Sequence, residues 1–187
     1  RDFGMRALLS MRLEKNFPTW FAELRPIYGP FEGGMERFVK LNKSDFIGRA
    51  AATKELSDGP KLRRTSFLIS QGTCDVMGDE PIWAKTSKNF DSIEPPHGHG
   101  APRFDARGVE IAASKPQQDG EWRVVGWVTS GGYAHSVGAS MAQGYLPTEL
   151  SELGGEGQFE IEILGERRPA KIATGAPFDP SGERMRG

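Results

Sequence analysis

The sequence of 187 residues has little cysteine, little net charge and no long apolar run. Its one cysteine, Cys74, cannot form an internal disulfide, so nothing favours an oxidising compartment. No catalytic partner stands near Cys74 in the sequence, so we do not expect a nucleophile there. The formal net charge is −1, with Lys and Arg dispersed among acidic residues. Bulk electrostatics therefore predict neither a nucleic-acid partner nor an anionic membrane surface.

Several motifs are also missing. No apolar stretch approaches the ~20 residues that cross a bilayer. There is no GxGxxG dinucleotide fingerprint and no GxxxxGK phosphate loop. His97 and His99 stand two residues apart, but nothing nearby completes a ligand set, so we predict no metal site. The chain begins with Arg1 rather than Met, and we expect it to be the interior of a longer or processed chain.

The first third of the sequence predicts an incomplete helical unit. Over the whole chain, apolar residues make up 37% and charged residues 26%, a composition that indicates a buried core. Apolar side chains within 3–11 fall on one helical face, although so short a helix has little to pack on. Residues 16–34 are rich in Pro and Gly and predict a loop whose aromatic residues plug a core or line a pocket. A helix is predicted at about 45–56, capped by Ser44 and ended by Gly59-Pro60.

The remainder predicts strands. The stretches 62–69, 122–129 and 158–164 are β-type, and Phe159, Ile161 and Ile163 alternate with glutamates. Gly165-Glu166 predicts a turn, with a return strand over 169–174. We therefore expect an all-β unit from about residue 61 to the end, interrupted by an insertion or mobile hairpin at about 85–120.

Four stretches together resemble the glycine-cleavage T-protein (aminomethyltransferase) family, and most of all the folate-binding portion of dimethylglycine and sarcosine dehydrogenases. They are Arg6–Lys15 with its Arg12-Leu-Glu14, Gly34–Arg49 with its Asp45-Phe-Ile-Gly-Arg49, Val125–Gly138 with its Thr129-Ser-Gly-Gly-Tyr133 followed by Gly144-Tyr-Leu-Pro147, and Ile163–Ala170. The family's iron–sulfur branch carries a cysteine where this chain reads Asp45–Arg49, so that branch is not favoured.

The resemblance implies an α+β fold in two parts. Residues 1–58 would be the truncated end of the folate-binding aminomethyltransferase domain, and residues 59–187 a small carboxyl-terminal β barrel carrying the 85–120 insertion. Tetrahydrofolate is the implied cofactor, with FAD only in a missing upstream part if the dehydrogenase interpretation holds. The implied partners are a small-molecule amine and folate, with no nucleic acid and no membrane. The implied location is the mitochondrial matrix in a eukaryote and the cytoplasm in a bacterium.

The resemblance also implies folate-binding residues. Glu14 matches the acid that contacts the pterin, whose adjacent N–H groups suit a carboxylate; the alternative is a solvated charge at a helix end. Tyr28 would stack on the ligand or fill the core. Arg37 and Lys43 are candidates for meeting the carboxylates of the folate tail, or are solvated. Tyr133 and His135 would face the ligand channel, or hold a domain interface. No catalytic residue is expected in this chain, because the family's aspartate lies upstream.

These residues favour part of a tetrahydrofolate-dependent enzyme that passes a methylene unit from a methylated amine to folate, and the chain alone is expected to have no turnover. Two alternatives stay open. The chain could be part of a T-protein or a folate-dependent demethylase, or a non-catalytic folate-binding or interaction module.

Overall fold

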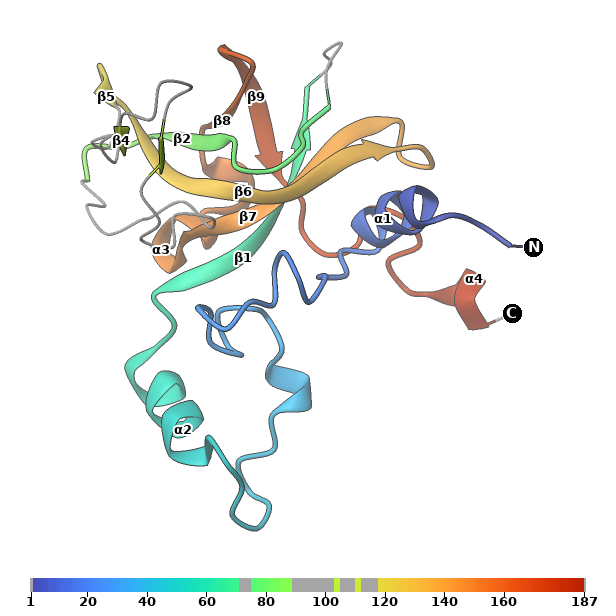
Figure 1. Cartoon of the computed structure of the whole chain (residues 1–187), viewed down its shortest axis with the longest axis vertical. Coiled ribbons are helices and arrows are strands. Elements are labelled where there is room, and N and C mark those ends of the chain that lie inside the picture. The colour runs from blue at the N-terminus through green and yellow to red at the C-terminus, as the bar shows by residue number, and fades with distance from the viewer. Residues whose placement is uncertain (1, 71–74, 89–102, 105–109, 112–117, 187) are drawn as a thin grey trace.

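The chain folds around an antiparallel β barrel (Figure 1). A computed structural model describes residues 2–70, 75–88, 103–104, 110–111 and 118–186. Six strands follow one another in the order β2-β8-β9-β1-β7-β6, and β6 pairs back onto β2, which closes the barrel. Their bounds are β1 Leu62–Ile69, β2 Pro81–Lys85, β6 Trp122–Ala134, β7 Ala139–Pro147, β8 Phe159–Ile163 and β9 Glu166–Ile172. The prediction of a small carboxyl-terminal barrel is confirmed.

Three very short strands complete the described sheets. Strand β5 (Gln118–Asp119) pairs with β6, and β3 (Arg103–Phe104) pairs with β4 (Glu110–Ile111) as a separate ribbon. Cys74, where we expected no nucleophile, lies outside the described residues, as do His97 and His99, where we expected no metal site. Most of the predicted insertion at 85–120 also lies outside them.

The barrel core explains why these segments form strands. The apolar residues of β8 are buried and its two glutamates only partly so, as the alternating pattern predicts. Phe67 of β1 meets Phe159 of β8 edge to face, with ring centroids 5.8 Å apart. The strands β8 and β9 are joined by Leu164 and Gly165, both at positive φ (51° and 83°), as in a two-residue type I′ hairpin turn. The turn is therefore one residue earlier, and the return strand three residues earlier, than predicted.

The helices are short and lie outside the barrel. They are α1 Met5–Glu14, α2 Arg49–Asp58, α3 Thr148–Ser151 and α4 Glu183–Arg186, with 3₁₀ turns η1 Glu36–Phe38 and η2 Gly154–Glu156. Helix α1 confirms the predicted helix and extends it to Glu14. Helix α2 ends at Gly59 as predicted, but the predicted start at Ser44-Asp45 is wrong. Its N-cap is Gly48 at φ 91°, without a side-chain cap, so the chain enters the helix through a backbone conformation that favours glycine.

Helix α1 and the carboxyl-terminal tail lie on the same side of the barrel, whereas the segment that carries α2 extends away from it (Figure 1). Helix α1 packs on β6 and β7, residues 41–58 extend as an arm away from the barrel, and the carboxyl-terminal tail returns toward α1 and ends near it (Figure 1). Residues 16–34 form turns without regular structure, as predicted. No helix in the described part of the chain has the length and apolar character to cross a bilayer.

Candidate functional site

The carboxylate of Glu14 lies at the end of α1, where this helix meets the tip of the β6–β7 hairpin. The residue is only 4% exposed, so the interpretation of Glu14 as a solvated charge is wrong. Its Oε1 accepts a hydrogen bond from the Ser136 backbone N–H at 2.7 Å. Within the described part of the chain, its Oε2 has no hydrogen-bond partner, yet it is not among the buried unpaired atoms and so still reaches solvent. One acceptor oxygen is thus fixed and the other is available.

The sequence stops α1 directly after Glu14. Asn16 takes the left-handed conformation (φ 55°), which Asn tolerates better than most residues. The Asn16 N–H then donates to the Leu13 carbonyl at 2.9 Å, and the Phe17 N–H to the Arg12 carbonyl at 2.8 Å. This pair of bonds is a Schellman motif. It fixes the helix end and with it the backbone of Glu14.

Two further predicted residues belong to the same hairpin. The rings of Tyr133 and His135 contact edge to face, with centroids 5.1 Å apart, and both side chains are exposed. The Ser10 hydroxyl of α1 donates to the Tyr133 carbonyl at 2.7 Å. The structure therefore brings the hairpin that carries Tyr133 and His135 against the helix that carries Glu14.

The other three predicted residues make contacts elsewhere. Tyr28 stacks on Tyr145 of β7, with centroids 3.6 Å apart and ring planes 13° apart, and burial raises the pKa of Tyr28 to about 12. The Arg37 guanidinium lies 4.5 Å from the ring centroid of Phe38, and the Lys43 ammonium 4.6 Å from that of Phe46. The segment that carries Arg37 and Lys43 leads into the arm away from α1 (Figure 1).

A buried ion pair between Arg12 and Glu23 lies next to the end of the helix that carries Glu14. The Arg12 Nη1 donates to Glu23 Oε2 and to Gln143 Oε1, both at 3.1 Å, while its Nη2 donates to Ser130 Oγ at 2.6 Å. Arg12 is 7% exposed and Glu23 fully buried. One guanidinium thus joins α1 to the loop at Glu23 and to strands β6 and β7.

A bulge in β6 lets two consecutive hydroxyls reach Glu23. The register with β7 shifts between Val128 and Ser130, so Thr129 is an extra residue in the strand. In a regular strand neighbouring side chains point to opposite faces. Here the hydroxyls of Thr129 (2.8 Å) and Ser130 both donate to Glu23 Oε1. The glycine-rich stretch 129–133 therefore forms bulged strand rather than a turn.

The Asn16 side chain forms a second centre of the same interface. Its Oδ1 accepts from Arg64 Nη1 at 2.8 Å, from Ser66 Oγ at 2.6 Å and from Gln143 Nε2 at 3.2 Å. Gln143 therefore bonds both Arg12 and Asn16, the residues two before and two after Glu14. The ends of the Glu14 segment are held to the barrel by one side chain.

The electrostatics of the ion pair follow from burial and its partners. Burial alone would raise the pKa of Glu23, but the charge of Arg12 and the hydrogen bonds from Ser130, Thr19 and Thr129 outweigh it and hold that pKa below its ordinary value. Burial lowers the pKa of Arg12, and Glu23 opposes this. Both groups are ionised at neutral pH.

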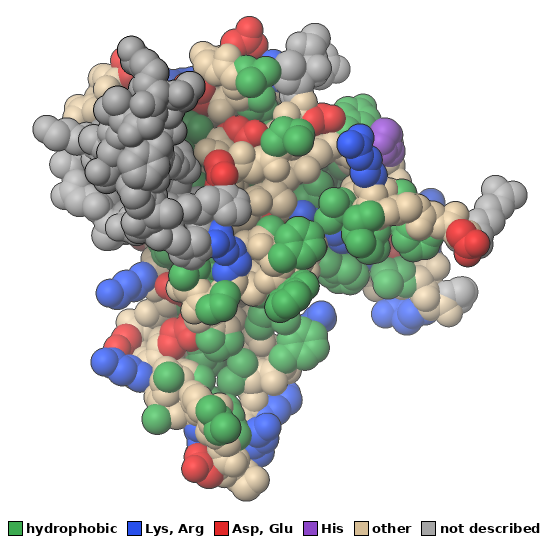
Figure 2. All heavy atoms as spheres, viewed as in Figure 1, with side chains coloured by type: hydrophobic (Ala, Val, Ile, Leu, Met, Phe, Trp, Pro, Cys, Tyr) green, Lys and Arg blue, Asp and Glu red, His purple; other side chains and the backbone are tan. Residues whose placement is uncertain are grey.

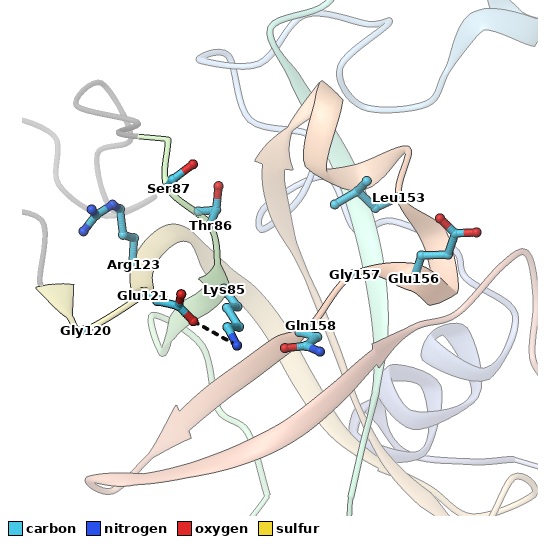
Figure 3. A pocket seen from close by; sticks show the side chains of 10 residues that line it. All are labelled: Lys85, Thr86, Ser87, Gly120, Glu121, Arg123, Leu153, Glu156, Gly157 and Gln158. Carbon is cyan, nitrogen blue, oxygen red and sulfur yellow. Dashed lines mark ion pairs between the residues drawn. The ribbon is translucent and has the colours of Figure 1, made fainter.

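A separate hollow of about 570 Å³ lies between the β2 end and the segment from Leu153 to Gln158 (Figure 3). Its charged lining is partly neutralised within the wall, since Lys85 pairs with Glu121 at 2.9 Å. Figure 3 shows Arg123 pointing away from Leu153 and Glu156. None of the predicted folate residues lines it. Among the described residues, no cluster of three or more His, Cys, Asp or Glu could hold a metal ion.

Comparison with known proteins decides the family. The sequence profile of the glycine cleavage T-protein C-terminal barrel domain matches residues 63–179. The chain belongs to this family. The family's match begins with β1 and ends with Asp179, and it therefore includes the closed barrel and the first part of the tail.

Two curated relatives are similar over most of this chain. It is 35% identical over 172 residues to mouse mitochondrial dimethylglycine dehydrogenase, covering 91% of this chain and 15% of the relative. It is 27% identical over 191 aligned positions to mouse mitochondrial sarcosine dehydrogenase, covering 98% of this chain and 17% of the relative. The chain thus spans about a sixth of the length of each.

A solved structure shares the fold. The glycine cleavage system aminomethyltransferase T from Bartonella henselae superposes with a TM-score of 0.64 at 21% identity. The superposition covers 94% of this chain and 38% of that one. The T-protein resemblance read from the motifs is confirmed.

Sequence reasoning missed the residues that build the interface. Glu23 lies in a loop among aromatic residues, Gln143 lies in an unpredicted strand, and Asn16 gave no periodic signal. The one available signal was the Arg12-Leu-Glu14 motif, in which a conspicuous arginine stands two residues before the candidate acid. Such an arginine needs a buried partner if its helix face packs on a core.

Proposed function

We propose that this chain is the carboxyl-terminal part of a tetrahydrofolate-dependent one-carbon-transfer enzyme, and that Glu14 binds the pterin of the folate. The observation that carries the proposal is the buried Glu14 carboxylate, with one oxygen fixed by the Ser136 N–H and one oxygen still available. A pterin edge presents adjacent N–H donors, which suit a fixed carboxylate acceptor. The N–H donors of the pterin therefore match the acceptor oxygen of the Glu14 carboxylate.

The domain division is part of this proposal. Residues 1–58 would be the end of a folate-binding domain and residues 59–187 the barrel domain with its insertion. Support comes from the short helices of 1–58 and from the exposed apolar side chains of this segment. Figure 2 shows apolar side chains exposed on one face of the molecule. Exposed residues include Phe3, Met5, Trp20, Phe21 and Ile47. Such a face is typical of a surface covered by another part of a protein.

The proposed roles of the remaining folate candidates differ. Tyr133 and His135, on the hairpin that holds Glu14, would line the ligand channel. Arg37 and Lys43 would act only at the more distant folate tail. Tyr28 would stack on the ligand or fill the core, and its stacking on Tyr145 favours the core role. No residue of this chain is proposed as the general acid or base.

Among enzymes of this kind, we propose a dimethylglycine or sarcosine dehydrogenase-like flavoprotein, because relatives with those names align over nine-tenths of this chain or more. Its flavin would bind outside this chain, and the one-carbon unit of the oxidised amine would pass to tetrahydrofolate. Both relatives are mitochondrial by name. For this protein we propose the mitochondrial matrix if its source is a eukaryote and the cytoplasm if its source is a bacterium.

The second candidate is a T-protein, favoured by the fold shared with an aminomethyltransferase T. The presence or absence of a bound flavin distinguishes the two candidates. A bound flavin in the full-length protein, meaning the longest natural protein that contains this chain, favours the dehydrogenase. Its absence together with turnover of a carrier-linked aminomethyl group favours the T-protein.

The test is steady-state kinetics of Glu14→Gln in the full-length protein. The amide keeps the shape but loses the charge and one acceptor, so the KM for tetrahydrofolate should rise about tenfold or more. Oxidation of the amine, followed by an artificial electron acceptor, should stay unchanged. An unchanged KM for tetrahydrofolate would contradict the proposed role of Glu14.

A further inference from the structure

The carboxyl-terminal tail completes the helix end that presents Glu14. The last turn of α1 leaves four carbonyls to satisfy. The Lys15 N–H bonds the Met11 carbonyl, and the Schellman pair satisfies those of Arg12 and Leu13. The carbonyl of Glu14 has no helical donor and accepts instead from the Phe178 N–H, at 3.1 Å. A segment more than 160 residues away in the sequence thus supplies the missing bond.

The next residue of the tail reinforces this contact. The Lys15 Nζ donates to the Asp179 carbonyl at 2.6 Å and to its Oδ2 at 3.2 Å. The side chains of this pair are only 15% and 7% exposed, so the pair is less screened than a surface ion pair. Lys15 is also the C-cap of α1, where a cation is favoured by the helix dipole. The Lys15–Asp179 ion pair therefore stabilises the contact between the end of α1 and the carboxyl-terminal tail.

The tail is itself held in the shape that allows these bonds. Asp179 is in the left-handed region at φ 46°, which turns the chain sharply at this point. The Gly182 N–H donates to the Asp179 carbonyl at 2.9 Å, and the Arg184 N–H to its Oδ1 at 3.4 Å. Asp179 consequently joins the α4 region to Lys15.

We propose that Asp179 is a positioning residue for Glu14, acting through Lys15 and the backbone at the end of α1. This inference rests on the proposed folate contact of Glu14. Glu14 is fixed at its carboxylate by Ser136 and at its carbonyl by Phe178, and Asp179 holds the second of these supports in place. Losing the Asp179 carboxylate would let the helix end shift and carry the Glu14 carboxylate out of line with the pterin.

The test is a double-mutant cycle of Asp179→Asn and Glu14→Gln on the Kd for 5-formyltetrahydrofolate, measured by titration of the full-length protein. Asp179→Asn should weaken binding about fivefold in the native background and less than about 1.5-fold in the Glu14→Gln background. Lys15→Met should weaken binding at least as much as Asp179→Asn, because it also removes the bond to the Asp179 carbonyl, and adding Asp179→Asn to it should weaken binding little further. The neighbouring exposed acid Glu183, changed to Gln, serves as control and should leave the Kd unchanged.

The outcomes separate this inference from the proposed function. If Glu14→Gln leaves the Kd unchanged, the folate contact itself is wrong and this inference falls with it. If Glu14→Gln weakens binding but Asp179→Asn has no effect, or the same effect in both backgrounds, the positioning role alone is overturned. Circular dichroism on each variant identifies any that fail to fold, and Asp179→Gly, which suits the left-handed backbone, then replaces Asp179→Asn.

Discussion

At the scale of single residues, the charge of Glu23 is stable in the interior because donors surround it. Its two oxygens accept five hydrogen bonds, from Arg12, from the N–H and hydroxyl of Thr19, and from the hydroxyls of Thr129 and Ser130. A buried carboxylate without such partners would cost far more than its packing returns. This ion pair therefore anchors the Glu14 segment to the barrel.

Replacing Glu23 by Gln should destabilise the chain strongly. The amide leaves the Arg12 cation buried without its counter-charge, so the free energy of unfolding should fall by about 3 kcal/mol. Urea denaturation followed by circular dichroism measures this. The exposed Glu152, changed to Gln, is the matched control and should shift the free energy by less than about 0.5 kcal/mol. Equal effects of the two changes would contradict the anchoring role.

The same residue predicts a pH dependence. The pKa of Glu23 is lower in the folded than in the unfolded chain, where it is near 4.5. Its stabilising contribution is thus complete above about pH 4.5 and is lost as the pH falls through the folded pKa. Unfolding measured from pH 7 down to pH 3 should show a decline in stability that is smaller in Glu23→Gln. A decline of the same size in both proteins would rule Glu23 out as its source.

Sequence reasoning pointed to only some of the residues that meet at the end of α1, and their role in binding folate stays a prediction. Glu14, Tyr133 and His135 follow from motifs, and the structure places them where α1 meets one hairpin. Asn16, Glu23, Gln143 and Asp179 did not follow, because each has at least one partner more than a hundred residues away. Hydrogen bonds between such distant segments leave no periodic trace in the sequence.

At the scale of elements, the strand pair β6–β7 sets the position of the site. It carries the bulge at Thr129, the hairpin that meets Glu14 and the side chain of Gln143. The nearby Gly131 is required by packing. A Cβ at Gly131 would lie 2.6 Å from the Val76 Cβ and 2.8 Å from the Met141 carbonyl oxygen. Gly131 thus allows β6 to pack against Val76 and β7.

Replacing Gly131 by Ala should therefore destabilise the barrel. The added methyl group overpacks the site and should cost about 1–3 kcal/mol in the free energy of unfolding. Gly155→Ala is the matched control, since a Cβ there meets nothing within 4 Å. Thermal unfolding of both variants provides the comparison. A Gly131→Ala protein as stable as the Gly155→Ala protein would show that β6 can move away from Val76.

The elements that sequence reasoning found and missed differ in their burial. Strand β8 has one buried face and was predicted from its alternation. Strand β7 is buried at nearly every position and rich in small residues, so it carries no alternation. Strand β2 is short and opens with Pro81. Helix α2 follows the left-handed N-cap Gly48 instead of starting at Ser44. A pattern of capping residues in the sequence does not predict such a start.

At the scale of the whole molecule, the two ends of the chain are unlike. The barrel has a continuous apolar core that includes Phe67, Ile82, Val128, Leu146 and Ile161. Residues 1–58 contribute few buried apolar residues and expose many large ones. The polar network at Arg12 and Asn16 holds their first part to the barrel, while the arm that carries α2 extends beyond it (Figure 1). This contrast supports the proposal that 1–58 belongs to a larger domain.

The proposed domain division predicts that Trp20 matters only in the full-length protein. Trp20 is 79% exposed here, so Trp20→Ser should change the free energy of unfolding of this chain by less than about 0.5 kcal/mol. If the full-length protein covers the residue, the same change there should cost about 3 kcal/mol or more. Chemical denaturation of both proteins makes the comparison. Similar small effects in both would show that Trp20 stays uncovered.

The central claim, that Glu14 contacts the pterin, is tested most directly by titrating tetrahydrofolate into the full-length protein and into its Glu14→Gln variant. A charge-assisted contact predicts a Kd about 10-fold to 100-fold higher in the variant, with Glu152→Gln unchanged as control. Equal Kd values for the native protein and Glu14→Gln, in variants that fold normally, would contradict the claim.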